Sequence, residues 1–200
     1  MNLVTAAAVF AVIFPAELPD KTMIAGLVLG ARFRPGFVWC GMALAFAVHV
    51  VIAVAAGGLL SLAPDWLVRS IAAVLFLVGA VVLIREPSEA EMEEEESEEV
   101  DRVAGTGPPS PLRVVGTAFV VVFVAEWGDL TQILTATLAA RYHDPLSVAV
   151  GAVAALWTVA AIAVVSGRAL LRVVPIDVVR RVAAAVLVFL AVLAIVDIFR

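Results

Sequence analysis

Phe14-Pro15-Ala16-Glu17-Leu18-Pro19-Asp20-Lys21-Thr22 places two carboxylates and an ammonium group inside an apolar run that extends from Leu3 to Ala31. The pattern returns 109 residues later as Phe123-Val124-Ala125-Glu126-Trp127-Gly128-Asp129-Leu130-Thr131. A carboxylate at the centre of a membrane helix costs about 2.5–3.5 kcal/mol on insertion scales. Four of them at repeated positions therefore indicate a binding site or a proton relay, and transport is the function that they favour.

The composition is that of an integral membrane protein. Hydrophobic residues make up 64% of the 200 residues and the mean hydropathy is +1.10, well above the values of soluble domains. Each apolar run is long enough to cross a hydrocarbon core, which requires ~20 helical residues. We predict an all-α fold with six transmembrane helices, at Leu3 to Ala31, Gly36 to Leu62, Trp66 to Ile84, Val114 to Ala140, Leu146 to Leu171 and Val178 to Ile198.

A charged stretch divides the chain into two halves. Glu86 to Asp101 contains ten acidic residues and no basic one, and Gly105 to Pro111 has the composition of a flexible, solvated linker. We predict a first three-helix repeat at residues 1–85, an acidic, Pro/Gly-rich cytoplasmic linker at 86–111 and a second three-helix repeat at 112–200. Because each half has an odd number of helices, the second half must enter the membrane in the opposite sense, which gives inverted repeats. Inverted repeats of secondary transporters place their substrate site near the midplane.

The arginines predict an orientation. Nine of them fall on one side of the predicted helices, against three on the other (Arg69, Arg141 and Arg200). The positive-inside rule then puts both termini outside and the acidic linker in the cytoplasm of a multi-pass protein of the cell (inner) membrane.

The motif side chains fit a hard cation. On a continuous helix, Glu17 and Asp20 project from one face, and so do Glu126 and Asp129. Two such pairs facing each other would offer up to eight carboxylate oxygens. Oxygen ligands suit calcium, magnesium or manganese. Crowded acids in a low-dielectric site also hold protons readily, and a divalent cation would displace them.

Four residues beside the acids carry further expectations. Pro15 and Pro19 predict a kink in the first motif helix, with a weaker bend at Gly128 in the second. Lys21 could bind an anion or reach the membrane surface, but its spacing favours an ion pair with a motif acid that tunes the site.

Two features outside the motifs favour packing. We expect His49 to be a satisfied core histidine rather than a proton relay, because its counterpart in the repeat is Thr158. Gly26-x-x-x-Gly30 is a small-residue ridge that predicts close helix packing.

The chain resembles the six-helix calcium/manganese cation-proton antiporters of bacterial plasma membranes, plastids and the Golgi, which carry paired E-x-G-D-[KR]-[ST] motifs. The resemblance implies that the cation is bound by Glu17, Asp20, Glu126 and Asp129, with Thr22 and Thr131 as secondary ligands. Pro19 replaces the usual Gly, and Leu130 replaces the usual basic residue. We expect the second change to make the empty site more electronegative and more fully protonated.

We therefore predict a secondary active transporter, not an enzyme, that exchanges Mn²⁺ or Ca²⁺ for protons and has no permanently bound cofactor. We expect it to interact with the lipid bilayer and the cation and not with nucleic acid. The sequence is also compatible with a homo-oligomer. The chain lacks a phosphate-binding Gly-rich loop, which favours the proton gradient over ATP as the energy source. The alternatives are a proton-coupled exporter of a small organic solute such as an amino acid, a passive channel and a non-transport membrane subunit.

Overall fold

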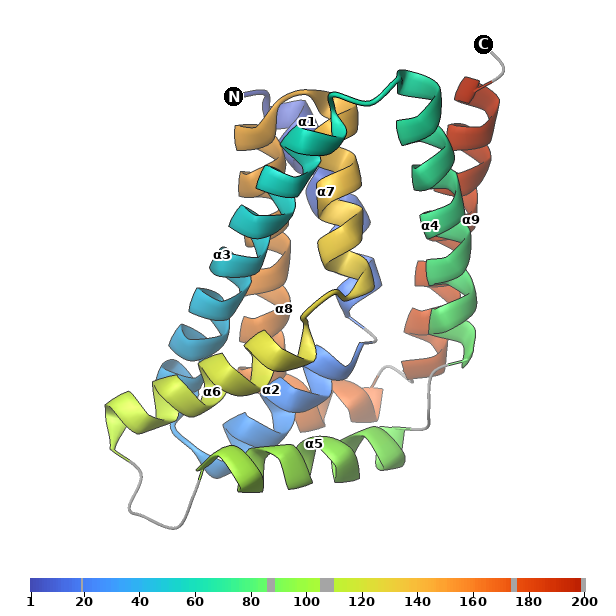
Figure 1. Ribbon diagram of the computed structural model, residues 1–200. Helices are drawn as coiled ribbons and strands as arrows, with labels where there is room; N and C mark the ends of the chain where they lie inside the picture. Colours follow the sequence, from blue (N-terminus) through green and yellow to red (C-terminus); the bar gives the residue numbers. More distant parts are fainter. Residues whose placement is uncertain (19, 86–88, 105–109, 174–175, 199–200) are drawn as a thin grey trace.

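The protein is all-α over the residues that the computed structural model describes, which are 1–18, 20–85, 89–104, 110–173 and 176–198. No strand occurs in these ranges, so the predicted fold class is confirmed to that extent. The helices are shown in Figure 1 and are α1 (Leu3–Glu17), α2 (Lys21–Arg32), α3 (Pro35–Leu60), α4 (Asp65–Arg85), α5 (Glu89–Ala104), α6 (Pro111–Ala125), α7 (Leu130–Tyr142), α8 (Pro145–Val173) and α9 (Ile176–Ile198).

Between two and four segments of the described chain could cross a membrane by length and composition. Helix α3 qualifies alone, as does the Pro145–Val165 part of α8. The pairs α1 with α2 and α6 with α7 qualify only if each bent pair forms one span. Helices α4 and α9 carry shorter apolar stretches, Trp66–Val82 and Ala184–Val196. The structure thus supports a membrane protein, while the six spans stay a prediction.

Helix contacts between the two halves are reciprocal. Helix α1 packs against α8 while α6 packs against α3, and α2 packs against α8 while α7 packs against α3. Helices α3 and α8 contact each other, and α4 lies beside α9 at one edge of the bundle (Figure 1). The exchange of partners brings the break between α1 and α2 close to the break between α6 and α7.

Small residues let α2 approach α8 closely. A Cβ atom added to Gly26 would lie 2.7 Å from the Cβ of Ala163, and one added to Gly30 would lie 2.8 Å from the carbonyl oxygen of Val164. Both distances are shorter than van der Waals contact, so only glycine fits at these positions without a shift of the backbone. The predicted packing ridge is confirmed.

The described part of the acidic stretch, Glu89–Ala104, is helical. These residues form α5, which lies across one end of the bundle and packs against α2 and α6 (Figure 1). Glu and Ala favour helix, and Val100 supplies a fully buried anchor. Arg32 of α2 is bound by Asp101 and also donates a hydrogen bond of 2.6 Å to Ser97. Residues 86–88 and 105–109 of the predicted linker lie outside the described residues.

Candidate metal centre

The first motif lies at a break between two helices. Glu17 is the last residue of α1, and Asp20 is the N-cap of α2, where its Oδ1 accepts a hydrogen bond of 2.7 Å from the backbone N–H of Lys21. The two helices meet at 71°. The expectation that Glu17 and Asp20 share one turn of a continuous helix is wrong, because Asp is a preferred N-cap residue and starts a new helix. Pro15 stays inside α1, and Pro19 lies outside the described residues.

The second motif is broken in the same way. Glu126 is the C-cap of α6, Asp129 is the N-cap of α7, and the two helices meet at 73°. Between them Gly128 has φ +77°, a left-handed conformation that glycine adopts without a steric penalty. The bend is as large as the first, so the prediction of a weaker bend at Gly128 is wrong.

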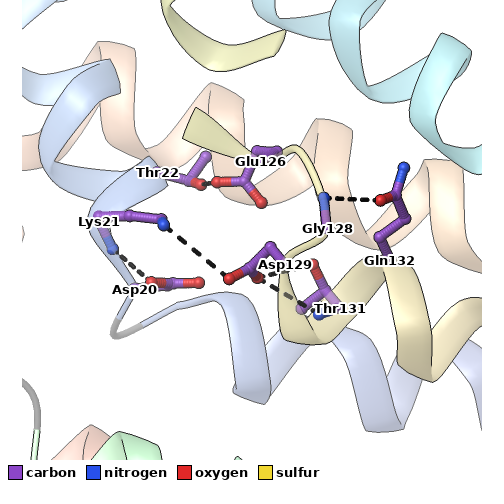
Figure 2. A network of polar contacts seen from close by, with 8 residues as sticks. All are labelled: Asp20, Lys21, Thr22, Glu126, Gly128, Asp129, Thr131 and Gln132. Atoms are coloured by element: carbon purple, nitrogen blue, oxygen red, sulfur yellow. Dashed lines mark hydrogen bonds and ion pairs between the residues drawn. The ribbon is translucent and has the colours of Figure 1, made fainter. Parts of the chain in front are cut away.

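The four motif acids converge from both halves. One carboxylate oxygen each of Glu17, Asp20, Glu126 and Asp129 lies within 4.8 Å of the other three. Calcium–oxygen bonds of about 2.3–2.6 Å allow ligand oxygens on opposite sides of an ion to lie about 5 Å apart. The cluster therefore has the dimensions of a site for one divalent cation. Side chains of both motifs face each other in Figure 2.

Glu17 is the most deeply placed of these acids. Its side chain is 0% exposed, and neither carboxylate oxygen has a hydrogen-bond partner within the described part of the chain. A buried carboxylate without partners is costly unless it is protonated or coordinates a cation. The described residues therefore leave the Glu17 carboxylate without the partner that its burial calls for.

The two motif threonines hold acids in place. The Thr22 hydroxyl donates a hydrogen bond to Oε1 of Glu126, which joins the halves (Figure 2). The Thr131 hydroxyl donates a longer bond, 3.4 Å, to Oδ2 of Asp129 in its own half. Both threonines are buried, and their hydrogen bonds orient the carboxylates of Glu126 and Asp129.

Lys21 pairs with an acid of the opposite half, as the predicted ion pair with a motif acid requires. Its Nζ lies 4.0 Å from Oδ1 of Asp129 (Figure 2). Leu130, the counterpart of Lys21, instead packs toward α4, since a Cβ atom on Gly79 would lie 2.5 Å from its Cδ2. Of the two equivalent residues, Lys21 therefore places a positive charge beside the acids, whereas Leu130 makes an apolar contact with α4.

Two residues behind the second break support it. Oε1 of Gln132 accepts a 2.9 Å hydrogen bond from the backbone N–H of Gly128 (Figure 2). The amide nitrogen of Gln132 lies 2.8 Å from Nδ1 of His49, whose Nε2 lies 3.1 Å from the carbonyl oxygen of Phe123. The N–H of Gly128 can only donate, so it fixes the oxygen of the Gln132 amide toward Gly128 and the NH₂ group toward His49. Gln132 therefore donates to Nδ1 of His49, and the Nε2–H of His49 donates to the carbonyl oxygen of Phe123.

His49 is therefore a satisfied core histidine, as predicted, and its neutral form suits this chain of hydrogen bonds. Sequence reasoning missed that it supports the break through Gln132. The repeat offered no signal for this role, because the corresponding positions hold Thr158 and Met23. A cavity of about 10 Å³ borders His49, Gln132 and Glu126, which is room for about one water molecule beside the second motif.

Comparison with known proteins matches both halves of the chain to one family. Residues 5–91 and 114–200 match the family described as divalent cation/proton antiporter GDT1. The chain is 29% identical to the GDT1-like protein sll0615 of Synechocystis sp., over 76% of this chain and 78% of that protein. It is 31% identical to the chloroplastic protein PAM71 of Arabidopsis thaliana, over 80% of this chain.

The chloroplastic GDT1-like protein 1 of Oryza sativa subsp. indica is 32% identical over 80% of this chain. The chain spans about half the length of these chloroplast proteins, 48% of PAM71 and 52% of the rice protein. No solved structure matches the chain. The two matched ranges cover both breaks and all four converging acids, and the chain belongs to the GDT1 family of divalent cation/proton antiporters.

Proposed function

We propose that this chain exchanges a divalent cation, Mn²⁺ or Ca²⁺, for protons at a site formed by Glu17, Asp20, Glu126 and Asp129. The observation that carries the proposal is the convergence of one oxygen from each acid to within 4.8 Å of the others. Membership of a family of cation/proton antiporters supports the reaction class. The hard oxygen ligands favour calcium or manganese over a soft metal.

Charge balance couples the cation to protons. Four ionised carboxylates and the Lys21 ammonium would leave a net charge of −3 in a largely buried cluster. Protons offset this charge when the site is empty, and a divalent cation offsets part of it when the site is loaded. Binding of the cation therefore displaces protons, and protonation on the other side of the membrane would release the cation. Glu17, whose oxygens have no partner in the described structure, is suited to accept either one.

Alternating access would come from two inverted halves. Reciprocal contacts between the halves, and a broken helix pair in each, support a pseudo-twofold arrangement of six spans. Discontinuous helices whose ends meet at the site are a recurring feature of secondary transporters. On this proposal both termini lie on the outer side of the cell (inner) membrane, and α5 lies on the cytoplasmic side.

A small organic solute is a weaker candidate for the substrate. An amino acid would need room and a basic partner for its carboxylate, but the four acids are packed within 4.8 Å of one another and Lys21 is paired with Asp129. These contacts favour a bare ion over an amino acid.

The test is metal-dependent proton flux in proteoliposomes that contain only this protein. A gradient of Mn²⁺ or Ca²⁺ should drive proton movement, and Asp20→Asn and Asp129→Asn should each abolish it. Amino acid gradients serve as the comparison. Cation flux without proton movement would contradict the antiporter proposal, and the absence of any flux would favour a non-transport subunit.

A further inference from the structure

One carboxylate of the acidic helix α5 differs from its neighbours. Glu94, Glu95 and Glu98 are exposed, whereas Glu96 is only 8% exposed. Its Oε2 is buried and has no hydrogen-bond partner among the residues that the structure describes. Glu96 lies one turn before the fully buried Val100, on the face of α5 that packs against the bundle. A helix rich in glutamate thus buries one of them at a cost, where an apolar residue would pack better.

The charged groups around Glu96 single out Lys21. Helix α5 packs against α2 and α6. From α2, Lys21 acts on Glu96 electrostatically, while Arg32 is engaged with Asp101 and Ser97. From α6, Arg113 lies exposed in the first turn.

Two acids of different kinds therefore act on Lys21. Asp129 of the motif cluster lies 4.0 Å from its Nζ, and Glu96 of α5 attracts the ammonium electrostatically. The lysine side chain is 41% exposed and has a flexible four-carbon stem, so its ammonium can move between them.

We propose that Glu96 is a fifth functional carboxylate, which receives the ammonium of Lys21 when a divalent cation occupies the four motif acids and displaces Lys21 from Asp129. The inference rests on the proposed function, since it needs a cation at that cluster. A divalent ion bound to Asp129 repels the ammonium beside it and offsets the charge that held it there. Glu96 is the buried acid on which Lys21 already acts.

The move of Lys21 would also release a proton. Burial raises the pKa of Glu96 to about 7, an effect that Glu95 reinforces and Lys21 opposes. While Lys21 is held by Asp129, a pKa of about 7 keeps a large fraction of Glu96 protonated near neutral pH. Closer approach of the ammonium favours the ionised carboxylate, so the O–H bond of Glu96 breaks and the proton passes to water on the side of α5. Cation loading would then be coupled to a proton outside the motif cluster.

The test compares Glu96→Gln with Glu98→Gln, an exposed glutamate of the same helix. In proteoliposomes, Glu96→Gln should raise the apparent KM for Mn²⁺ roughly tenfold, because Lys21 keeps competing for Asp129. It should also reduce the number of protons that purified protein releases on binding Mn²⁺ near pH 7. Glu98→Gln should match the wild type in both respects. Retention of the circular dichroism spectrum excludes misfolding of the variant as the cause.

A double-mutant cycle separates this role from a structural one. In a Lys21→Met background there is no ammonium to receive, so Glu96→Gln should cause no further change in KM. An equal effect of Glu96→Gln in both backgrounds, or identical behaviour of Glu96→Gln and Glu98→Gln in an active transporter, would overturn the role of Glu96. Absence of cation-driven proton flux in the wild type would instead overturn the proposed function together with this inference.

Discussion

The hydroxyl of Thr22, in the first turn of α2, donates a hydrogen bond to the carboxylate of Glu126 at the end of α6. The bond joins residues 104 positions apart and lies in the buried interior. It is therefore a direct polar link between the two halves at the proposed cation site. Thr131, at the equivalent position, makes its bond within its own half.

Thr22→Val should impair transport more than Thr131→Val. Hydrogen bonds to charged groups contribute about 1.5–3 kcal/mol, so loss of the link to Glu126 should lower kcat/KM for the cation roughly tenfold or more. The 3.4 Å bond of Thr131 to Asp129 is weaker, and its loss should cost less. Initial rates of Mn²⁺-driven proton flux give the comparison. Equal effects of the two variants would mean that the link between the halves has no special role.

Glu17→Gln should separate stability from transport. The variant removes a buried charge whose oxygens have no hydrogen-bond partner in the described chain, so Tm without metal should be no lower than that of the wild type. Cation binding stabilises only a protein with a working site. We therefore expect the rise in Tm on adding Mn²⁺ to disappear in the variant. A rise of wild-type size would exclude Glu17 as a ligand.

Leu130→Lys should alter the pH dependence of exchange. A second lysine would make the empty cluster less electronegative and less fully protonated, so the pH profile should shift. The same change removes an apolar side chain that packs toward Gly79, which should lower Tm. Leu130→Met is the matched control, because it keeps an apolar side chain without adding charge. An unchanged pH profile in Leu130→Lys would contradict the expectation.

Gly128→Ala should strain the second break. Residues with a Cβ atom pay roughly 1–2 kcal/mol to adopt a left-handed conformation, and Gly128 has φ +77°. We expect a lower Tm and slower exchange. Gly116→Ala in α6 is the control, since Gly116 is helical and has no atom within 4 Å of an added Cβ. That variant should be as stable as the wild type or more so, and comparable losses in both would show that the conformation of Gly128 is not the cause.

Docking of α5 should weaken as pH rises toward neutrality. Glu96 has a pKa of about 7 in the folded protein against an ordinary value of 4.5, so between these two pH values the docked helix holds a proton that the undocked helix does not. Stability of docking therefore falls with increasing pH across this window, by up to about 3 kcal/mol.

The test is the rate at which a thiol reagent labels Val100→Cys in a Cys40→Ser background. Between pH 5 and pH 7 this rate should rise by more than the ionisation of a free thiol alone would produce. Adding Glu96→Gln should remove the excess acceleration. If the additional rise in labelling rate persists in that variant, a group other than Glu96 controls the opening of α5.

The motifs and the apolar runs carried enough information to predict the helical class and the family, because burial of charge in an apolar segment is visible in sequence alone. Convergence of Glu17 and Asp20 with Glu126 and Asp129 was also expected from the repeat, and the structure brings these four together. The assignment of cation binding to them remains a prediction.

Local detail at the motifs was harder to predict. A spacing of three residues predicts one helical turn, but the structure has a helix break at each motif. Asp20 and Asp129 each cap the start of a new helix, and Gly128 adopts a left-handed conformation. The packing of α5 escaped prediction because an acidic run is normally solvated, and only tertiary contact decides that Glu96 is buried.

The presence of Lys21 in one half and Leu130 in the other has a consequence for the transport cycle. Two identical inverted halves would make the conformations open to either side equal in free energy. In this chain a single ammonium, contributed by α2 and paired with Asp129 of the other half, makes the two halves unequal at the proposed site. On the proposed alternating-access cycle, the empty protein should then favour the conformation that is open to one side of the membrane. A variant with lysine at both positions should populate the two conformations more evenly.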